Sequence, residues 1–112
     1  MKPSEIVKKL GWCKGHLAVD SEGFEVSANS TEVDSVCSVG AIYRSFGFDG
    51  HKEIRYGDVS TYRQLFESRI GTLYMGLWND DPKRTKEEVI AKLEEVEKEL
   101  GWDDNRYPFK GE

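Results

Sequence analysis

The chain has 112 residues, of which 16 are lysine or arginine and 21 are aspartate or glutamate, giving a formal net charge of -5. This length suits one domain with a single core, and the acidic balance argues against binding to a nucleic-acid backbone. There is no apolar run of about 18 residues, so we expect no membrane span. The two cysteines are too few for a disulfide framework. Because the N-terminal residues contain no apolar signal core, we expect a cytoplasmic protein.

The first predicted helix begins at Ser4, whose hydroxyl can cap it, and ends at Gly11 with Trp12 behind it. Gly101 and Trp102 stand in the same relation to the end of the last predicted helix. A glycine followed by an apolar residue is typical of a left-handed helix end. The sequence therefore predicts two Schellman-type ends.

A β-hairpin is predicted after the first helix. Two short apolar segments, 17–19 and 24–26, flank four turn-forming residues that end in Gly23. A glycine at that position suits a type I turn with a bulge. Since a two-stranded hairpin is marginally stable alone, we expect it to pack on helices.

The next predicted helix begins at Asn29 or Thr31, each of which has an acidic residue three positions later. Small side chains on this helix allow another element to approach closely, so we expect the helix to be central. The residues that define its faces are Val33, Val36, Cys37, Gly40, Ala41 and Arg44.

Residues 45–59 show neither a helical nor a strand period. A further helix is predicted from Ser60 or Thr61 up to an interruption at Gly71. The apolar residues of 73–78 continue a helical spacing, which favours a second short helix over a strand.

The last helix has the strongest local signals and is predicted from Thr85 to Leu100. Thr85 and Glu88 form the pattern of a capping box. Pro82 disfavours a continuous helix from Trp78 onward. An apolar stripe along this helix is expected to face the core.

In this region Trp78, Asn79, Asp80 and Pro82 are followed by Arg84, Thr85, Glu88 and Val89. This order resembles the W-N-D-x-P-x-R-T-x-x-E-V signature of a small family from actinobacteria and their phages. That family is known only as a domain of unknown function, so the resemblance implies a phage or mobile-element setting and no catalytic residues. Further similarity lies at Gly11-Trp12 and in the segment 37–41.

The sequence contains few residues that could bind a soft metal ion or act as a nucleophile. Cys13, His16, Cys37 and His51 are the candidate zinc ligands, but their spacing matches no zinc motif, so we expect neither zinc nor another cofactor. An alternative interpretation makes Cys37 a nucleophile near a helix N-terminus, with His51 as its base. Its orienting carboxylate would be Asp49, Asp58 or Asp80.

A binding surface is predicted on the segment 45–59 and the turn 78–81. The segment is long for a connection between helices, and its aromatic and cationic side chains are typical of binding hot spots. In the alternative interpretation, the aromatic side chains fill one end of the core. The candidate binding residues are Phe46, Phe48, His51, Arg55, Tyr56, Trp78, Asn79 and Asp80.

The acidic residues of the turn have two interpretations. Asn79, Asp80 and Asp81 could hold a divalent cation, but adjacent residues of these types more often form a turn through their own backbone. Arg84 is predicted either to pair with Asp80 or Asp81 or to lie in solvent.

Together these patterns predict one mainly α domain over 1–112, a compact bundle of four to five helices with one small β-hairpin and a loose tail from about 103. The predicted function is that of a small intracellular, phage-related interaction or accessory protein without catalytic activity. Its partner would be another protein, and neither nucleic acid nor a membrane is expected. The alternative is a cysteine-dependent hydrolase or transferase using Cys37 and His51.

Overall fold

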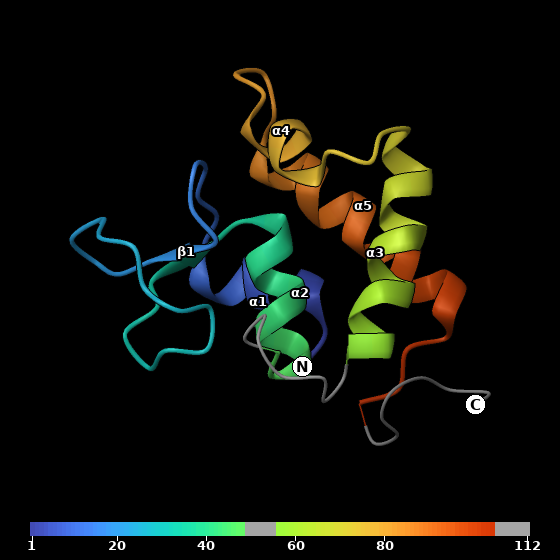
Figure 1. Ribbon diagram of the computed structural model, residues 1–112, viewed down its shortest axis with the longest axis horizontal. Helices are drawn as coiled ribbons and strands as arrows, with labels where there is room; N and C mark the ends of the chain where they lie inside the picture. The colour runs from blue at the N-terminus through green and yellow to red at the C-terminus, as the bar shows by residue number, and fades with distance from the viewer. Residues whose placement is uncertain (49–55, 105–112) are drawn as a thin grey trace.

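The computed structural model describes residues 1–48 and 56–104, and no description is given of the side chain of Tyr56. Within these ranges the chain is mainly α with one antiparallel pair of short strands, as predicted (Figure 1). The elements in order are α1 (Pro3–Leu10), β1 (Ala18–Val19), β2 (Ser35–Val36), α2 (Ser38–Phe46), α3 (Tyr56–Ile70), α4 (Met75–Asp80) and α5 (Lys86–Leu100).

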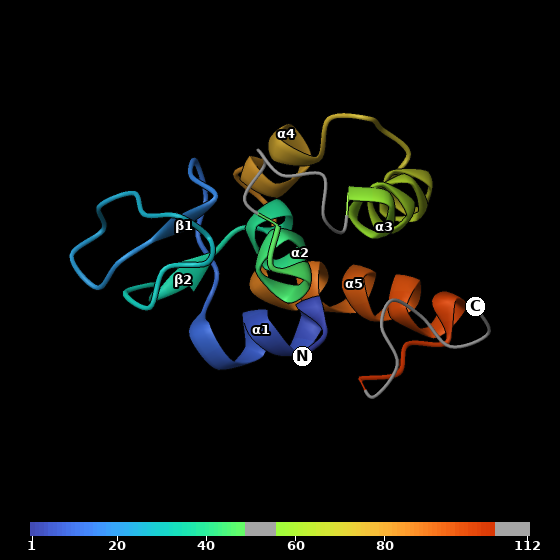
Figure 2. The ribbon, with the colours of Figure 1, turned by 60° about the horizontal axis from the view of Figure 1, so that its bottom comes forward.

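Helix α2 lies at the centre of the fold, as its small residues predict. It packs against α1, α3, α4 and β2, while α5 packs against α1 and α3. Figure 2 shows α2 between α1 and α4, with the two strands at one end of the molecule and α3 at the other. The core is built from fully buried side chains of all these helices, including Val7, Ile42, Phe66, Met75, Leu93 and Val96.

Helix α5 has both of its predicted ends. The Thr85 hydroxyl accepts a hydrogen bond from the Glu88 amide, and the Glu88 carboxylate accepts one from the Thr85 amide, which completes the capping box. At the other end, Gly101 has a φ of 64°, and the Trp102 amide donates to the Glu97 carbonyl at 3.0 Å. The prediction of a helix following Thr85 and ending at Leu100 is confirmed.

The predicted start of α1 is wrong. The helix does end before Gly11, as predicted, but not with the predicted Schellman-type conformation. Lys2 is the N-cap residue and Pro3 the first helical residue, because the buried Ser4 side chain is used in a contact with α5. Gly11 has a φ of 119° and a ψ of 172°, which is not the left-handed helical conformation. The chain leaves α1 extended because Trp12 forms a parallel bridge with Val36.

The hairpin has a different partner from the predicted one. Ala18 pairs with Val36 in an antiparallel ladder, whereas the predicted partner 24–26 makes only an isolated bridge between Val19 and Glu25. Burial explains the choice, because Val36 is fully buried and Phe24 is 67% exposed. The intervening turn does contain Gly23 at a positive φ of 87°.

Helix α2 begins later than predicted, because Val36 belongs to β2 and Cys37 is the N-cap residue. Residues 29–34 therefore form turns and not the first turns of a helix. The close approach expected of the small residues is present at Gly40. A Cβ atom there would lie 1.9 Å from the Leu17 carbonyl oxygen, so any side chain at this position would displace the β1 segment.

Two helices follow, as predicted, with an interruption at Gly71, whose φ is 77°. Helix α3 already begins at Tyr56, earlier than Ser60 or Thr61, and helix α4 is the predicted short helix. The predicted irregular segment 45–59 is therefore helical at both ends, in residues 45–46 and 56–59. Residues 49–55 lie outside the described part. Among the described helices, none is long and apolar enough to cross a membrane. The tail predicted to be loose is described only as far as Asp104.

Replacement of Thr85 by alanine should lower the free energy of unfolding by about 1 kcal/mol, because the Glu88 amide loses its capping acceptor. Urea denaturation followed by circular dichroism measures this change. Thr31→Ala, at an exposed threonine in the turn before β2, is the matched control. Equal denaturation midpoints for the two variants would contradict a stabilising capping box.

Candidate functional site

Asn79 is the buried centre of the predicted 78–81 site. It lies in the last turn of α4 with no exposed surface. Its Oδ1 atom accepts hydrogen bonds from the Trp12 indole at 2.8 Å and from the Ser38 amide at 2.9 Å. Its Nδ2 atom donates to the Cys13 carbonyl at 3.1 Å and to the Asp80 carboxylate at 3.0 Å. All four hydrogen-bonding positions of this carboxamide are therefore occupied.

The Asn79 carboxamide replaces one rung of a parallel ladder. The Val36 amide donates to the Gly11 carbonyl, and the Cys13 amide donates to the Val36 carbonyl. In a regular parallel ladder the next bond would join the Ser38 amide to the Cys13 carbonyl. Both groups bond to the Asn79 side chain instead, so α4 is inserted between the segment after α1 and the start of α2.

The two acids after Asn79 also hold the segment after α1. The Asp80 Oδ1 atom accepts a hydrogen bond from the Gly15 amide at 3.0 Å. The Lys14 ammonium donates to the Asp81 carbonyl at 2.8 Å, and the Lys83 amide donates to the Asp81 carboxylate at 2.9 Å. These contacts belong to a helix end and a turn, as the favoured interpretation of the acidic residues expects.

Trp78 and Arg84 form a stacked pair. The Arg84 guanidinium carbon lies 4.0 Å from the centroid of the Trp78 ring, and its Nε atom donates to the Trp78 carbonyl at 3.0 Å. Arg84 also pairs with Glu88 at 3.2 Å, so the predicted pairing with Asp80 or Asp81 is wrong. The indole also meets Phe66 edge to face. Trp78 is thus a partly buried anchor for α4.

A groove of about 320 Å³ lies beside α4. Cys37 and Val39 contribute to its lining from the start of α2, and the His16–Glu25 pair, with its nitrogen and oxygen 2.7 Å apart, stands at its rim. We call this cavity the α4 groove. The α4 residues that line it are Gly76 and Asp80, and Gly15 and Leu17 line it from the segment after α1.

Cys37 is a buried N-cap residue. Its side chain is 6% exposed, and its Sγ atom accepts a hydrogen bond from the Gly40 amide at 3.3 Å. Burial raises the pKa of this thiol, and the amides at the helix start offset the rise only in part. The proposed base, His51, lies outside the described residues. A raised thiol pKa is the reverse of what a cysteine nucleophile needs at neutral pH.

Of the four candidate zinc ligands, the structure describes Cys13, His16 and Cys37. Cys13 is half-buried, its thiol lies 3.6 Å from the His16 carbonyl oxygen, and burial together with the nearby Cys37 raises its pKa to about 12. Within 1–48 and 56–104, no three side chains of the metal-binding types are arranged to hold an ion.

Two aromatic residues of the predicted 45–59 surface lie at the C-terminal end of α2. Phe46 is 5% exposed and meets Trp102 edge to face, and Phe48 is 6% exposed and meets Tyr43 in the same way. Both rings occupy the positions that the core interpretation expects. His51 and Arg55 lie outside the described residues.

The sequence analysis missed a buried acid, Glu97 of α5, which is 3% exposed. Its carboxylate accepts hydrogen bonds from the Ser4 amide at 2.8 Å, from the Ser4 hydroxyl and from the Tyr62 hydroxyl at 2.8 Å. It thereby joins α5 to α1 and α3. The available signal was its position four residues after Leu93 on the apolar stripe.

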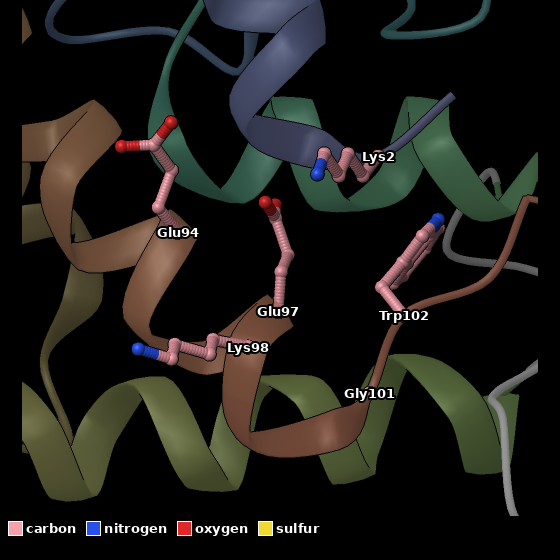
Figure 3. A pocket seen from close by; sticks show the side chains of 6 residues that line it. All are labelled: Lys2, Glu94, Glu97, Lys98, Gly101 and Trp102. Carbon is pink, nitrogen blue, oxygen red and sulfur yellow. The ribbon is translucent and has the colours of Figure 1, made fainter.

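Glu97 also lines a cavity of about 370 Å³ between α1 and the end of α5 (Figure 3). Lys2, Glu94 and Lys98 surround it, so opposite charges balance at the opening. Burial raises the pKa of the Glu97 carboxyl, while the hydrogen bonds from Ser4 and Tyr62 and the charge of Lys2 lower it by less.

Replacement of Asn79 by alanine should destabilise the protein by about 3 kcal/mol or more, because buried donors at Trp12 and Ser38 lose their acceptor. Chemical denaturation measures this change. Lys83→Ala, an exposed position in the following turn, is the control and should stay within about 0.5 kcal/mol of wild type. An Asn79→Ala variant as stable as this control would show that the inserted amide is dispensable.

Glu97→Gln should change how stability depends on pH. The folded carboxyl has a pKa above its ordinary value of 4.5, so it favours folding at acid pH, and this contribution is lost as pH rises through the folded pKa. Glutamine does not titrate, so the variant should gain stability relative to wild type as pH rises above about 4.5. Paired denaturation curves at several pH values test this, and a constant difference would refute it.

Comparison with known proteins gives a family but no activity. The model of a family of unknown function, DUF6197, matches residues 4–99. No curated protein and no solved structure matches the chain. The match begins in α1 and ends in the last turn of α5, so it covers the Asn79 contacts, the α4 groove and Glu97. The chain therefore belongs to DUF6197, a family of unknown function.

Proposed function

We propose that the protein is a small accessory protein that binds another protein through an apolar surface at α4. The observation that carries this proposal is the exposure of Leu73, Tyr74 and Leu77, which are 74%, 68% and 73% exposed. We call these three residues the α4 surface. Large apolar side chains that cluster on a surface are typical of sites for protein association.

The α4 surface is held by a rigid support. Met75 and Asn79 lie one turn apart on the buried side of α4, and each has almost no exposed area. Trp78 is held by its contacts with Phe66 and Arg84. The helix is too short to be stable alone, so its exposed side is ordered by these contacts. A surface that is ordered before binding loses less entropy on association.

The α4 groove adds shape to this surface. Gly76 lines it, and a Cβ atom there would meet no other atom within 4 Å. Leu17, which is 42% exposed, also lines the groove. A partner side chain could enter the groove while its neighbours contact Leu73 and Leu77. This arrangement of an anchor in a pocket with apolar contacts around it is usual at binding hot spots.

The position of Cys37 supports binding over the alternative of cysteine chemistry. The thiol is buried, its pKa is raised, and its sulfur is used to cap α2. The resemblance to a family of actinobacteria and their phages supports an accessory role inside a bacterial cell. The setting is therefore part of the proposal, together with the expectation of a protein partner.

The test uses the purified full chain as bait in a lysate of its native host, with a Leu73→Ser/Leu77→Ser variant beside it. We expect a specific partner with the wild type, and a dissociation constant that rises at least about tenfold in the variant because two apolar contacts are lost. Calorimetry with the identified partner measures the change.

Phe24→Ser is the matched control, because Phe24 is equally exposed but lies in the turn between β1 and β2. It should retain the affinity of the wild type. If the partner binds the double variant as tightly as the control, the α4 surface is not the binding site.

A further inference from the structure

The two cysteines of the chain lie opposite each other in neighbouring extended segments. Trp12 and Val36 form a parallel bridge, and the Cys13 amide donates to the Val36 carbonyl at 3.0 Å. Moving one residue along both segments pairs Cys13 with Cys37. Since side chains alternate between the two faces of extended chains, both thiols lie on the face opposite Trp12 and Val36.

The spacing at this pair suits a disulfide. Neighbouring strands are about 4.8 Å apart, which is near the short end of the range of about 4.4–6.8 Å between Cα atoms that disulfides join. The Asn79 carboxamide enters the ladder directly after Cys13, between its carbonyl and the Ser38 amide. The Cys13 amide still bonds to the Val36 carbonyl, so the two segments remain paired up to the cysteines.

The electrostatics of the two thiols agree with this register. The Cys37 thiolate raises the pKa of Cys13, and Asp80 raises the pKa of both. The half-buried Cys13 gives a reagent its first access, and Cys37 lines the α4 groove. Because the chain contains two cysteines in all, each has one possible partner within the molecule.

We propose that Cys13 and Cys37 are a dithiol that forms a reversible intramolecular disulfide by exchange with a low-molecular-weight disulfide. Cys13 loses its proton, and its thiolate attacks the small disulfide and releases one thiolate from it. The Cys37 thiolate then attacks the Cys13 sulfur and displaces the second. Two protein thiols are oxidised and one small disulfide is reduced. The two thiolates that leave take up the two protons lost by Cys13 and Cys37, which gives two small thiols.

The raised pKa values make this exchange slow at neutral pH, since only the thiolate attacks. The dithiol therefore stays reduced in a reducing cytosol and oxidises under sustained oxidising conditions. The disulfide would tie the segment after α1 to the start of α2. Because Gly15 and Leu17 follow Cys13 and line the α4 groove, oxidation would fix one wall of that groove.

The experiment treats the reduced full chain with oxidised glutathione at mildly alkaline pH and follows intact mass. We expect a product lighter by two hydrogen atoms, a disulfide-linked peptide containing Cys13 and Cys37 after digestion, and recovery of the starting mass with dithiothreitol. The melting temperature of the oxidised form should rise by about 5 °C or more, because the unfolded chain is constrained.

Cys13→Ser and Cys37→Ser are the controls, and serine is a favoured N-cap residue, so the second variant should remain folded. Each should gain at most one glutathione and never the intramolecular product. A stable glutathione adduct on Cys13 of the wild type, covalent dimers in place of the intramolecular product, or two thiols that stay free would each overturn the proposal.

Discussion

The fold depends on one neutral side chain, the Asn79 carboxamide. The segment after α1 and the start of α2 are parallel for only a single bridge, at Trp12 and Val36. Beyond it, the Ser38 amide and the Cys13 carbonyl would be buried without partners if Asn79 did not bond to both. A carboxamide has the donor and acceptor of a peptide group, so it can extend a ladder where the backbone does not reach.

Glu97 has a comparable position at the other side of the core, but its energetics differ. Its contacts with Ser4 and Tyr62 join three helices, as those of Asn79 join three segments. The carboxylate carries a charge that burial penalises, which is why its pKa is raised. Asn79 has no such penalty. The contacts of Asn79 therefore stabilise the fold at every pH, whereas the stabilisation that Glu97 provides depends on pH.

The sequence predicts this fold well where the determining contacts are local. The capping box of Thr85 and Glu88 and the left-handed Gly101 involve residues within one turn of each other, so their patterns specify α5 directly. The ends of α1 and the partner of β1 depend on contacts between distant residues. Ser4 matches the cap pattern but bonds to Glu97, 93 positions away. No local pattern contains that information.

In the candidate site, too, the sequence motif indicates some of the residues and not others. The Trp78-Asn79 part of the signature faces inward, where it holds the groove wall and the core. Side chains with several internal contacts of this kind stabilise the scaffold, so their replacement would lower its stability. Leu73 and Leu77 belong to no motif, yet both expose large apolar side chains. Leu77 lies on α4, which Asn79 fixes in place, and Leu73 lies just before this helix. Under the proposed function, partner choice would lie in these exposed residues, while Trp78 and Asn79 hold α4 in position.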